Sequence, residues 1–229
     1  MRHLSPVLLL SAAGLLAPLA FAKDAPTGPQ EIKAKGVISN VGGDPDQLIN
    51  GNGLSQEANP AARTHACMDK GGGFWNADAP PKGQPYFFDK KSKTPELVFD
   101  LGGAHKLKAL MVWNYSYSAA NDTAQRRSVA NVIVAVSDSE KGPWKPLTQL
   151  KFRNTEYNNG RITPQILALP AAQAKYVKLL ILGTQVPGPS ENIGMGELHF
   201  VGTPVEDAKA PAKAKETDKA KDKKPATGK

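Results

Sequence analysis

The chain has 229 residues, a formal net charge of +8 and 40% hydrophobic side chains, which suits one substantial globular domain with a basic surface. Its single cysteine, Cys67, excludes an internal disulfide, so this is not a small disulfide-stabilised scaffold. The surroundings of Cys67 indicate no function for the thiol, and we expect a small, partly buried side chain.

The N-terminus has the pattern of a cleaved secretory signal. Arg2 and His3 precede an apolar run over residues 4–19, and Ala20-Phe21-Ala22 is a small-x-small cleavage site. We therefore expect a signal peptide over residues 1–22, cut after Ala22. No later segment reaches the length of a membrane-spanning helix, so the sequence predicts a secreted or periplasmic protein without a transmembrane segment.

Residues 23–203 form the predicted domain, which reads as short strands separated by loops. No amphipathic helix of normal length interrupts them, and there is no internal repeat. This pattern predicts an all-β, antiparallel β-sandwich. The strands are expected at residues 96–101, 107–115, 129–137, 165–169, 176–182 and 197–201.

The segment Ser128–Leu147 is the clearest of these patterns. Its alternating residues are mostly apolar on both faces up to Ser137, which indicates a strand inside the sandwich. A polar turn with Gly142-Pro143 follows, and then Trp144. We expect Trp144, like Trp113 within its own strand, to pack in the core.

The C-terminal segment 204–229 consists almost entirely of Ala, Lys, Pro, Asp, Glu and Thr. It lacks the large apolar side chains that would offset the entropy of ordering, so we expect it to be disordered. Its basic charge suits an anionic cell-envelope polymer, and a solubilising spacer is the alternative. An exported protein would rarely meet nucleic acid, so a nucleic-acid partner is not expected.

Four segments then appear in a characteristic order: Asp100-Leu101-Gly102, the hairpin that closes on Trp144, Lys175-Tyr176-Val177-Lys178, and GMGEL at residues 194–198. Over residues 30–202 the chain resembles the discoidin-like, or coagulation factor 5/8 type C, domains and the bacterial family 32 carbohydrate-binding modules. The resemblance implies an eight-stranded jelly-roll of the galactose-binding-like fold. It also implies ligand binding by loops at one end, without catalysis.

An oxygen-rich loop over residues 44–53 suggests a structural Ca²⁺, which binds carboxylate, amide and backbone oxygens. Within the loop Asp46 is a candidate ligand, and by the resemblance Asn50, Asn52 and Glu197 would be ligands as well. Asn50 stands where the family usually has aspartate, which removes one negative charge from the site. A loop of ordinary Asx turns is the alternative.

Two long loops carry aromatic side chains beside hydrogen-bonding groups, the combination that suits a sugar. One contains Trp75 after three glycines, and the other spans residues 116–127. The predicted ligand-binding residues are Trp75, Asn76, Asn114, Tyr117, Arg126 and Arg127.

Each of these candidates has a structural alternative. Trp75 either stacks on ligand or packs as part of a lid. The two arginines either pair with surface acids or divide their roles, one holding the loop and the other contacting ligand. Asn114 either binds ligand or satisfies backbone groups of its own loop.

Catalysis is not expected. His65, His105 and His199 are scattered, and the chain has none of the motifs of hydrolases, metalloproteases or phosphate-binding loops. The sequence therefore predicts an exported, non-catalytic module that binds a carbohydrate or glycoconjugate. The alternative is an envelope adhesion or scaffolding protein that uses the same loops on a protein partner, with the basic tail on an anionic surface.

Overall fold

A computed structural model describes residues 30–116, 126–153 and 157–205. The predicted signal peptide, nearly all of the predicted tail and Tyr117 lie outside these residues. The described chain consists mainly of strands, with three short 3-10 helices at Pro45–Leu48, Pro60–Ala62 and Met68–Lys70. The all-β class is therefore confirmed. No helix in the described ranges is long and apolar enough to cross a membrane.

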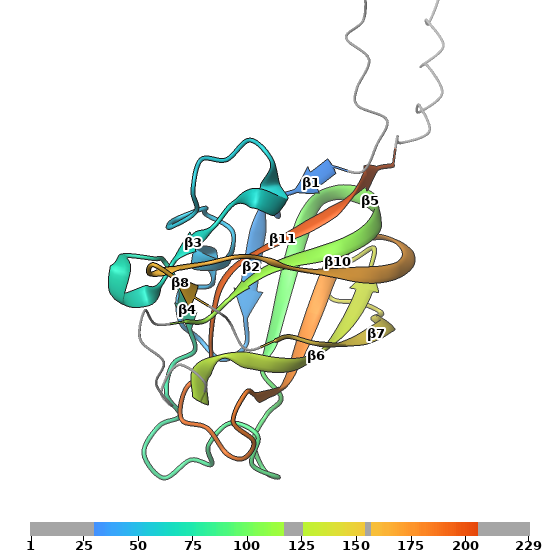
Figure 1. Cartoon of the computed structure of the whole chain (residues 1–229). Coiled ribbons are helices and arrows are strands. Elements are labelled where there is room, and N and C mark those ends of the chain that lie inside the picture. Colours follow the sequence, from blue (N-terminus) through green and yellow to red (C-terminus); the bar gives the residue numbers. More distant parts are fainter. Residues whose placement is uncertain (1–29, 117–125, 154–156, 206–229) are drawn as a thin grey trace, which may run out of the picture.

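Eight antiparallel strands form the main sheet (Figure 1). Several strands expected separately are parts of longer ones, because residues 96–114 and 165–184 each run as one continuous strand. Neighbouring strands along the sheet are β1 (Gln30–Ile32), β11 (Gly194–Pro204), β5 (Glu96–Asn114), β10 (Gln165–Thr184), β6 (Val129–Ser137) and β7 (Lys145–Lys151), while β2 (Gly36–Ser39) pairs with β5 and β4 (Trp75–Asn76) pairs with β11.

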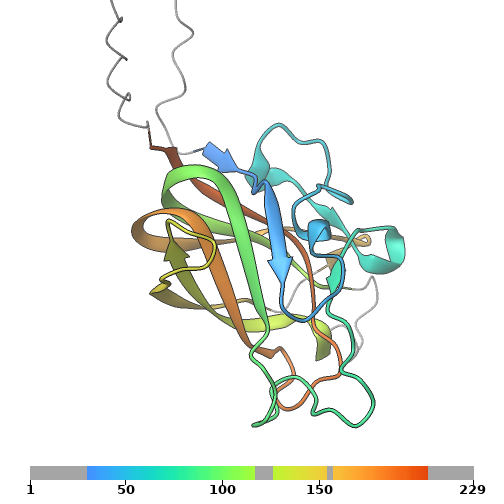
Figure 2. The same ribbon diagram turned by 180° about the vertical axis from the view of Figure 1, so that it is seen from behind.

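The two long strands fold this sheet into a sandwich. The first half of β5 pairs with the end of β10 and with β2, whereas its second half pairs with the start of β10 and with β11. The register shifts twice between these halves, and Gly102 adopts a φ of 74°, which favours glycine at a strand corner. Both strands curve strongly at this corner, and the sheet turns back over itself (Figures 1 and 2).

The core lies between the two layers. Val132, Val134 and Val136 point into it from β6, as the two-residue period of that strand predicts. Phe99 of β5 and Phe200 of β11 meet edge to face, with ring centroids 5.4 Å apart. Because these two rings come from different layers, their contact helps to hold the sandwich closed.

A second, smaller cluster covers the outer face of one layer. Met111, Trp113 and Tyr115 of the β5 region pack there beneath residues 65–75, which include β3 (His65–Ala66). Strand β3 joins β9 (Arg161–Ile162) and β8 (Tyr157–Asn158) in a separate small sheet. The loop expected over residues 50–93 is therefore partly a structured cover.

This arrangement settles three smaller expectations. Trp113 is fully buried, as expected for core, whereas Trp144 is only half-buried and lies under Lys178, whose Nζ is 4.7 Å from the ring centroid. The core assignment of Trp144 was therefore wrong, because β7 is an edge strand whose side chains meet solvent. Cys67 is fully buried, and that burial raises the pKa of its thiol.

Candidate ligand-binding site

Loops from three parts of the chain meet at one end of the sandwich. They are residues 80–88 before β5, Arg126-Arg127 before β6, and residues 184–192 between β10 and β11. Phe87 and Ser190 exchange backbone hydrogen bonds of 2.9 and 3.0 Å, which joins the first loop to the third. These loops lie at the lower end of Figure 1, away from β1 and the end of β11.

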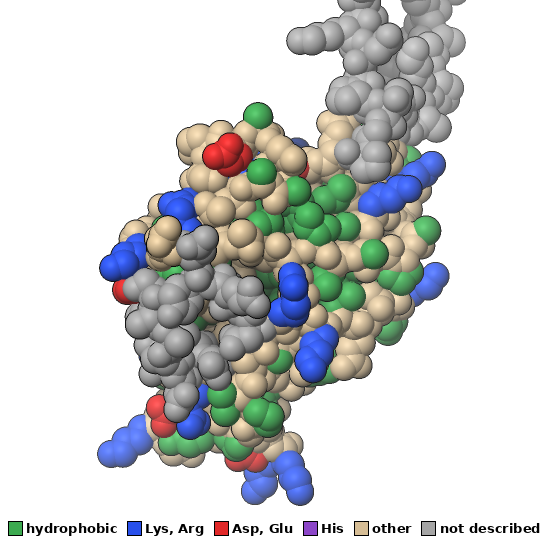
Figure 3. Space-filling model, viewed as in Figure 1, with side chains coloured by type: hydrophobic (Ala, Val, Ile, Leu, Met, Phe, Trp, Pro, Cys, Tyr) green, Lys and Arg blue, Asp and Glu red, His purple; other side chains and the backbone are tan. Residues whose placement is uncertain are grey.

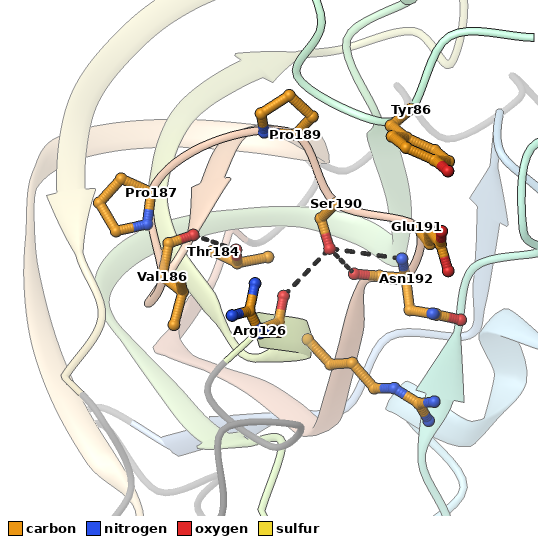
Figure 4. A pocket seen from close by; sticks show the side chains of 10 residues that line it. Tyr86, Arg126, Thr184, Val186, Pro187, Pro189, Ser190, Glu191 and Asn192 are labelled. Carbon is orange, nitrogen blue, oxygen red and sulfur yellow. Dashed lines mark hydrogen bonds between the residues drawn. The ribbon is translucent and has the colours of Figure 1, made fainter.

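Together the loops enclose a cavity of about 320 Å³, which we call the Tyr86 pocket. Figure 4 shows its aromatic and charged side chains around an opening with prolines on the opposite wall. It is lined by Tyr86, Arg126, Arg127, Thr184, Val186, Pro187, Pro189, Ser190, Glu191 and Asn192.

Hydrogen bonds to the backbone hold the walls of the Tyr86 pocket. The Ser190 hydroxyl oxygen lies 2.6 Å from the Asn192 carbonyl and 3.1 Å from the Arg126 carbonyl (Figure 4). The Gln185 amide donates to the carbonyls of Val129 and Phe152, both at 2.9 Å. The third loop is therefore tied both to the segment that carries Arg126 and to the sandwich itself, so the pocket is largely formed before any ligand arrives.

Tyr86 is the exposed aromatic ring of this end, with 48% of its surface accessible. Interaction of its hydroxyl with the Glu191 carboxylate, through hydrogen bonding and the negative charge of Glu191, raises the pKa of Tyr86. The faces of the exposed ring remain available for an apolar contact.

The two arginines have different surroundings. Arg127 donates to the Tyr115 hydroxyl at 3.1 Å, and its guanidinium carbon lies 5.9 Å from the centre of the Tyr115 ring. The side chain of Arg126 is exposed. The two arginines therefore differ, as the alternative with divided roles expects. Arg127 is held against the body of the domain, and Arg126 faces solvent at the pocket.

Two predicted ligand residues lie in the interior instead. Trp75 has no exposed surface, and its Nε1 donates to the Gly42 carbonyl at 3.1 Å. Asn114 is 4% exposed, and its Nδ2 donates to the Val129 carbonyl at 2.7 Å. Their predicted contacts with ligand were wrong, because the cover and the neighbouring strands exclude solvent from both side chains. Each instead follows the structural alternative, internal packing for Trp75 and backbone satisfaction for Asn114.

Asn76 is half-buried on β4, opposite Gly194, and does not line the Tyr86 pocket. Of the six predicted ligand residues, the structure therefore brings Arg126 and Arg127 together at one cavity. Tyr86, Glu191 and Asn192 were not predicted. A signal for Tyr86 was present in its sequence, PPKGQPY over residues 80–86, where an aromatic residue follows three prolines and a glycine, a composition that favours a loop.

The predicted calcium loop and the last strand do meet in space. The Gly51 N–H donates to both carboxylate oxygens of Glu197, at 3.0 and 3.2 Å, and His199 Nε2 lies 2.7 Å from Glu197 Oε1. His199 Nδ1 lies 2.5 Å from Glu31, which also pairs with Arg63 at 2.7 Å. The buried carboxylate of Glu197 is therefore surrounded by N–H donors of the protein itself.

Some of the remaining oxygens of this loop have partners and others do not. Asn50 Oδ1 accepts the Asn52 N–H at 2.8 Å, and the Asn52 carbonyl accepts a hydrogen bond from Gly73. Asp46 is exposed, and the buried Oε1 of Gln47 has no hydrogen-bond partner in the described part of the chain. Among the described residues no group of three His, Cys, Asp or Glu side chains converges as a metal site. Calcium requires six to eight converging oxygens. Glu197 and Asn50 already accept N–H groups of the protein, and the Asx turn at Asn50 is the feature that the alternative interpretation expects. Calcium binding by this loop stays a prediction.

Comparison with solved structures identifies proteins that have a similar fold. A family 32 carbohydrate-binding module (CBM32) from a family 31 glycoside hydrolase of Clostridium perfringens superposes with a TM-score of 0.50 at 11% identity, over 76% of this chain and 95% of that one. The chain has a CBM32-like fold. This confirms the resemblance inferred from the sequence, and at such low identity the likeness concerns the fold alone.

Two further CBM32-like matches have lower scores. A chitobiase fragment from Bacteroides thetaiotaomicron matches at a TM-score of 0.49 and 18% identity, over 81% of this chain and 98% of that one. A second C. perfringens CBM32, in complex with GalNAc-β-1,3-galactose, matches at a TM-score of 0.47 and 12% identity, over 75% of this chain and 99% of that one. No family model matches the sequence, and no curated protein matches it either.

Proposed function

We propose that this chain is a non-catalytic carbohydrate-binding module whose ligand lies in the Tyr86 pocket. One observation carries the proposal: an exposed aromatic ring stands beside a preformed cavity with guanidinium, carboxylate and amide groups around it. The CBM32-like fold supports the same assignment. The ligand class is argued from the site, because one fold hosts many functions.

The groups of the pocket match the two kinds of surface that a sugar presents. The C–H face of a pyranose ring packs on an aromatic ring, which Tyr86 offers. Sugar hydroxyls both donate and accept, and they meet donors on Arg126 and Asn192 and an acceptor on Glu191. Since the third loop is already held by Ser190 and Gln185, binding orders few additional groups.

The same lining argues against glycoside hydrolysis. That reaction usually employs two carboxyl groups, one on each side of the bond that breaks. Among the described residues that line the Tyr86 pocket, Glu191 is the single carboxylate. We therefore propose binding without turnover.

A single ring limits the affinity of such a site. Covering about 100 Å² of apolar surface contributes about 2.5 kcal/mol at 25 cal/mol per Å². Association and the ordering of side chains cost several kcal/mol. We expect dissociation constants between about 1 µM and 1 mM for one sugar unit.

Screening the purified protein on a glycan array, followed by calorimetry with the best glycan, tests this proposal. Tyr86→Ala should weaken binding by at least about tenfold, because it removes the apolar platform. The melting temperature should change little, since the ring is exposed.

The matched control is Ile166→Ala, which removes an apolar side chain of similar exposure, 51%, outside the pocket. It should leave glycan affinity unchanged. Equal binding by Tyr86→Ala and the parent protein would overturn the site. Capture of one envelope protein with no response to any glycan would instead favour the adhesion role.

We also propose that the protein is exported, with cleavage after Ala22, on the signal pattern of residues 1–22. Expression of the full chain in a Gram-negative host, followed by N-terminal sequencing of the periplasmic fraction, should give a first residue of Lys23. Retention of Met1 in a cytoplasmic product would contradict this.

A further inference from the structure

A second cavity shares Tyr86 with the Tyr86 pocket. Its volume is about 710 Å³, and Tyr86 lines both cavities, so one residue belongs to both. We call it the lysine cavity, and it is lined by Pro80, Pro81, Lys82, Gly83, Gln84, Pro85, Tyr86 and Lys91.

The charged groups of the two cavities are mostly positive. Lys82 and Lys91 are both exposed, and neither forms a salt bridge within the described part of the chain. Arg126 and Arg127 add two guanidinium groups on the other side of Tyr86, where Glu191 is the one carboxylate. Lys and Arg side chains project from this lower end of the molecule in Figure 3.

Prolines restrict the backbone of the loop that lines the lysine cavity. Pro80, Pro81 and Pro85 line it, and each proline fixes its own φ angle near −65°. Phe87, two residues beyond Pro85, is buried and paired with Ser190 through the backbone. Lys82 is thus carried by a segment restrained at the residues around it, and Lys91 lies in a turn that the Ser92 N–H closes on the Asp89 carbonyl at 3.0 Å. These restraints limit the backbone entropy lost when an anion binds.

We propose that the two cavities together bind an acidic oligosaccharide. One sugar unit packs on Tyr86 in the Tyr86 pocket, and a neighbouring unit places a uronate or sulfate group between Lys82 and Lys91. This inference rests on the proposed function and names the class of glycan that the site selects.

The chemistry of lysine explains why carboxylate and sulfate groups are grouped together here. An ammonium is a compact point charge with rotatable donors, so it does not select a planar, bidentate partner as arginine does. Attraction between exposed charges is screened within about 8 Å at physiological ionic strength. Binding of the acidic unit should therefore weaken as salt is added, whereas packing on Tyr86 should not.

Pairs of glycans with the same backbone test this inference. Trigalacturonate is compared with its methyl ester, and a sulfated carrageenan oligosaccharide with its desulfated form, by calorimetry at 50 mM and 500 mM NaCl. The acidic member of at least one pair should bind at least about tenfold more tightly at low salt, and this preference should shrink at high salt.

The double variant Lys82→Gln/Lys91→Gln should lose that preference and keep the affinity for the neutral member. The control Lys106→Gln/Lys108→Gln removes two exposed lysines of β5 outside both cavities and should keep the preference. The control carries the same change in net charge, so it separates a local effect from a global one.

The outcomes separate this inference from the proposed function. Equal binding of acidic and neutral members, or an acidic preference that survives Lys82→Gln/Lys91→Gln, overturns the acidic-glycan inference and leaves carbohydrate binding in place. No binding of any member, here or on the array, overturns both. A preference abolished by the cavity variant and retained by the control supports the inference.

Discussion

Two regions of this molecule combine aromatic rings with charged and amide side chains, and they use them in opposite ways. Around Glu197 the polar groups bind one another: His199 lies between two carboxylates, Gly51 donates to Glu197, and Arg63 pairs with Glu31. Around Tyr86 the ring and Arg126 stay exposed. The difference shows that the same residue types form an internal hydrogen-bonded network in one place and an exposed surface in another, depending on which segments pack over them.

The largest effect should come from removing a buried aromatic ring of the main core. Trp75→Ala should reduce the free energy of unfolding by about 3–5 kcal/mol, because it leaves a cavity in that core. Thermal or urea unfolding measures the loss. Below the unfolding transition, the folded protein should bind glycan as the parent does, and a selective loss of affinity would return Trp75 to the ligand site.

Breaking the hydrogen-bonded network around Glu197 should destabilise the fold somewhat less than Trp75→Ala does. Glu197→Ala leaves the N–H groups of Gly51 and His199 without their acceptor in a buried position, which should cost about 3 kcal/mol. Glu140→Ala, at an exposed carboxylate, is the control and should change stability by less than about 0.5 kcal/mol.

The same unfolding measurement decides the role of calcium in this region. EDTA should leave the melting temperature of the parent protein unchanged, and millimolar CaCl₂ should not raise it. A fall in melting temperature on chelation would show that the loop rearranges around a cation, and that the hydrogen bonds seen here belong to a cation-free form.

The smallest effects should distinguish the two arginines. Arg126→Ala should weaken glycan binding several-fold with no change in melting temperature, because its side chain is exposed at the pocket. Arg127→Ala should lower stability by about 1 kcal/mol, since it removes the hydrogen bond and the cation–π contact with Tyr115. A loss of stability in Arg126→Ala together with a loss of affinity in Arg127→Ala would show that Arg127 contacts the glycan and that Arg126 holds the loop.

The sequence predicted the fold well because the fold depends on local patterns. The alternation in Val129–Ser137 and the turn before Trp144 identify their strands without knowledge of the rest of the chain. The continuity of β5 and β10 was missed, because the glycines and the proline at their corners resemble breaks between strands.

The candidate site was predicted less well, because it depends on contacts between distant segments. Trp75 follows three glycines and looks exposed in sequence, but its two-residue strand pairs with β11 and draws the ring into the core. Tyr86 remains at the surface because the backbone pairing of Phe87 with Ser190 holds the chain at the rim. Neither the pairing of β4 with β11 nor that of Phe87 with Ser190 is indicated by the sequence around these residues.

The pairing of β1 with the end of β11 has a practical meaning. Gln30 lies opposite Gly202, whereas β11 begins at Gly194 beside the loops that form the pocket. Whatever is fused to either flank of the domain, such as a reporter, an affinity handle or a resin, leaves from the pole opposite Tyr86. A handle joined at either flank would therefore be attached at the end of the domain that lies away from the loops of the Tyr86 pocket.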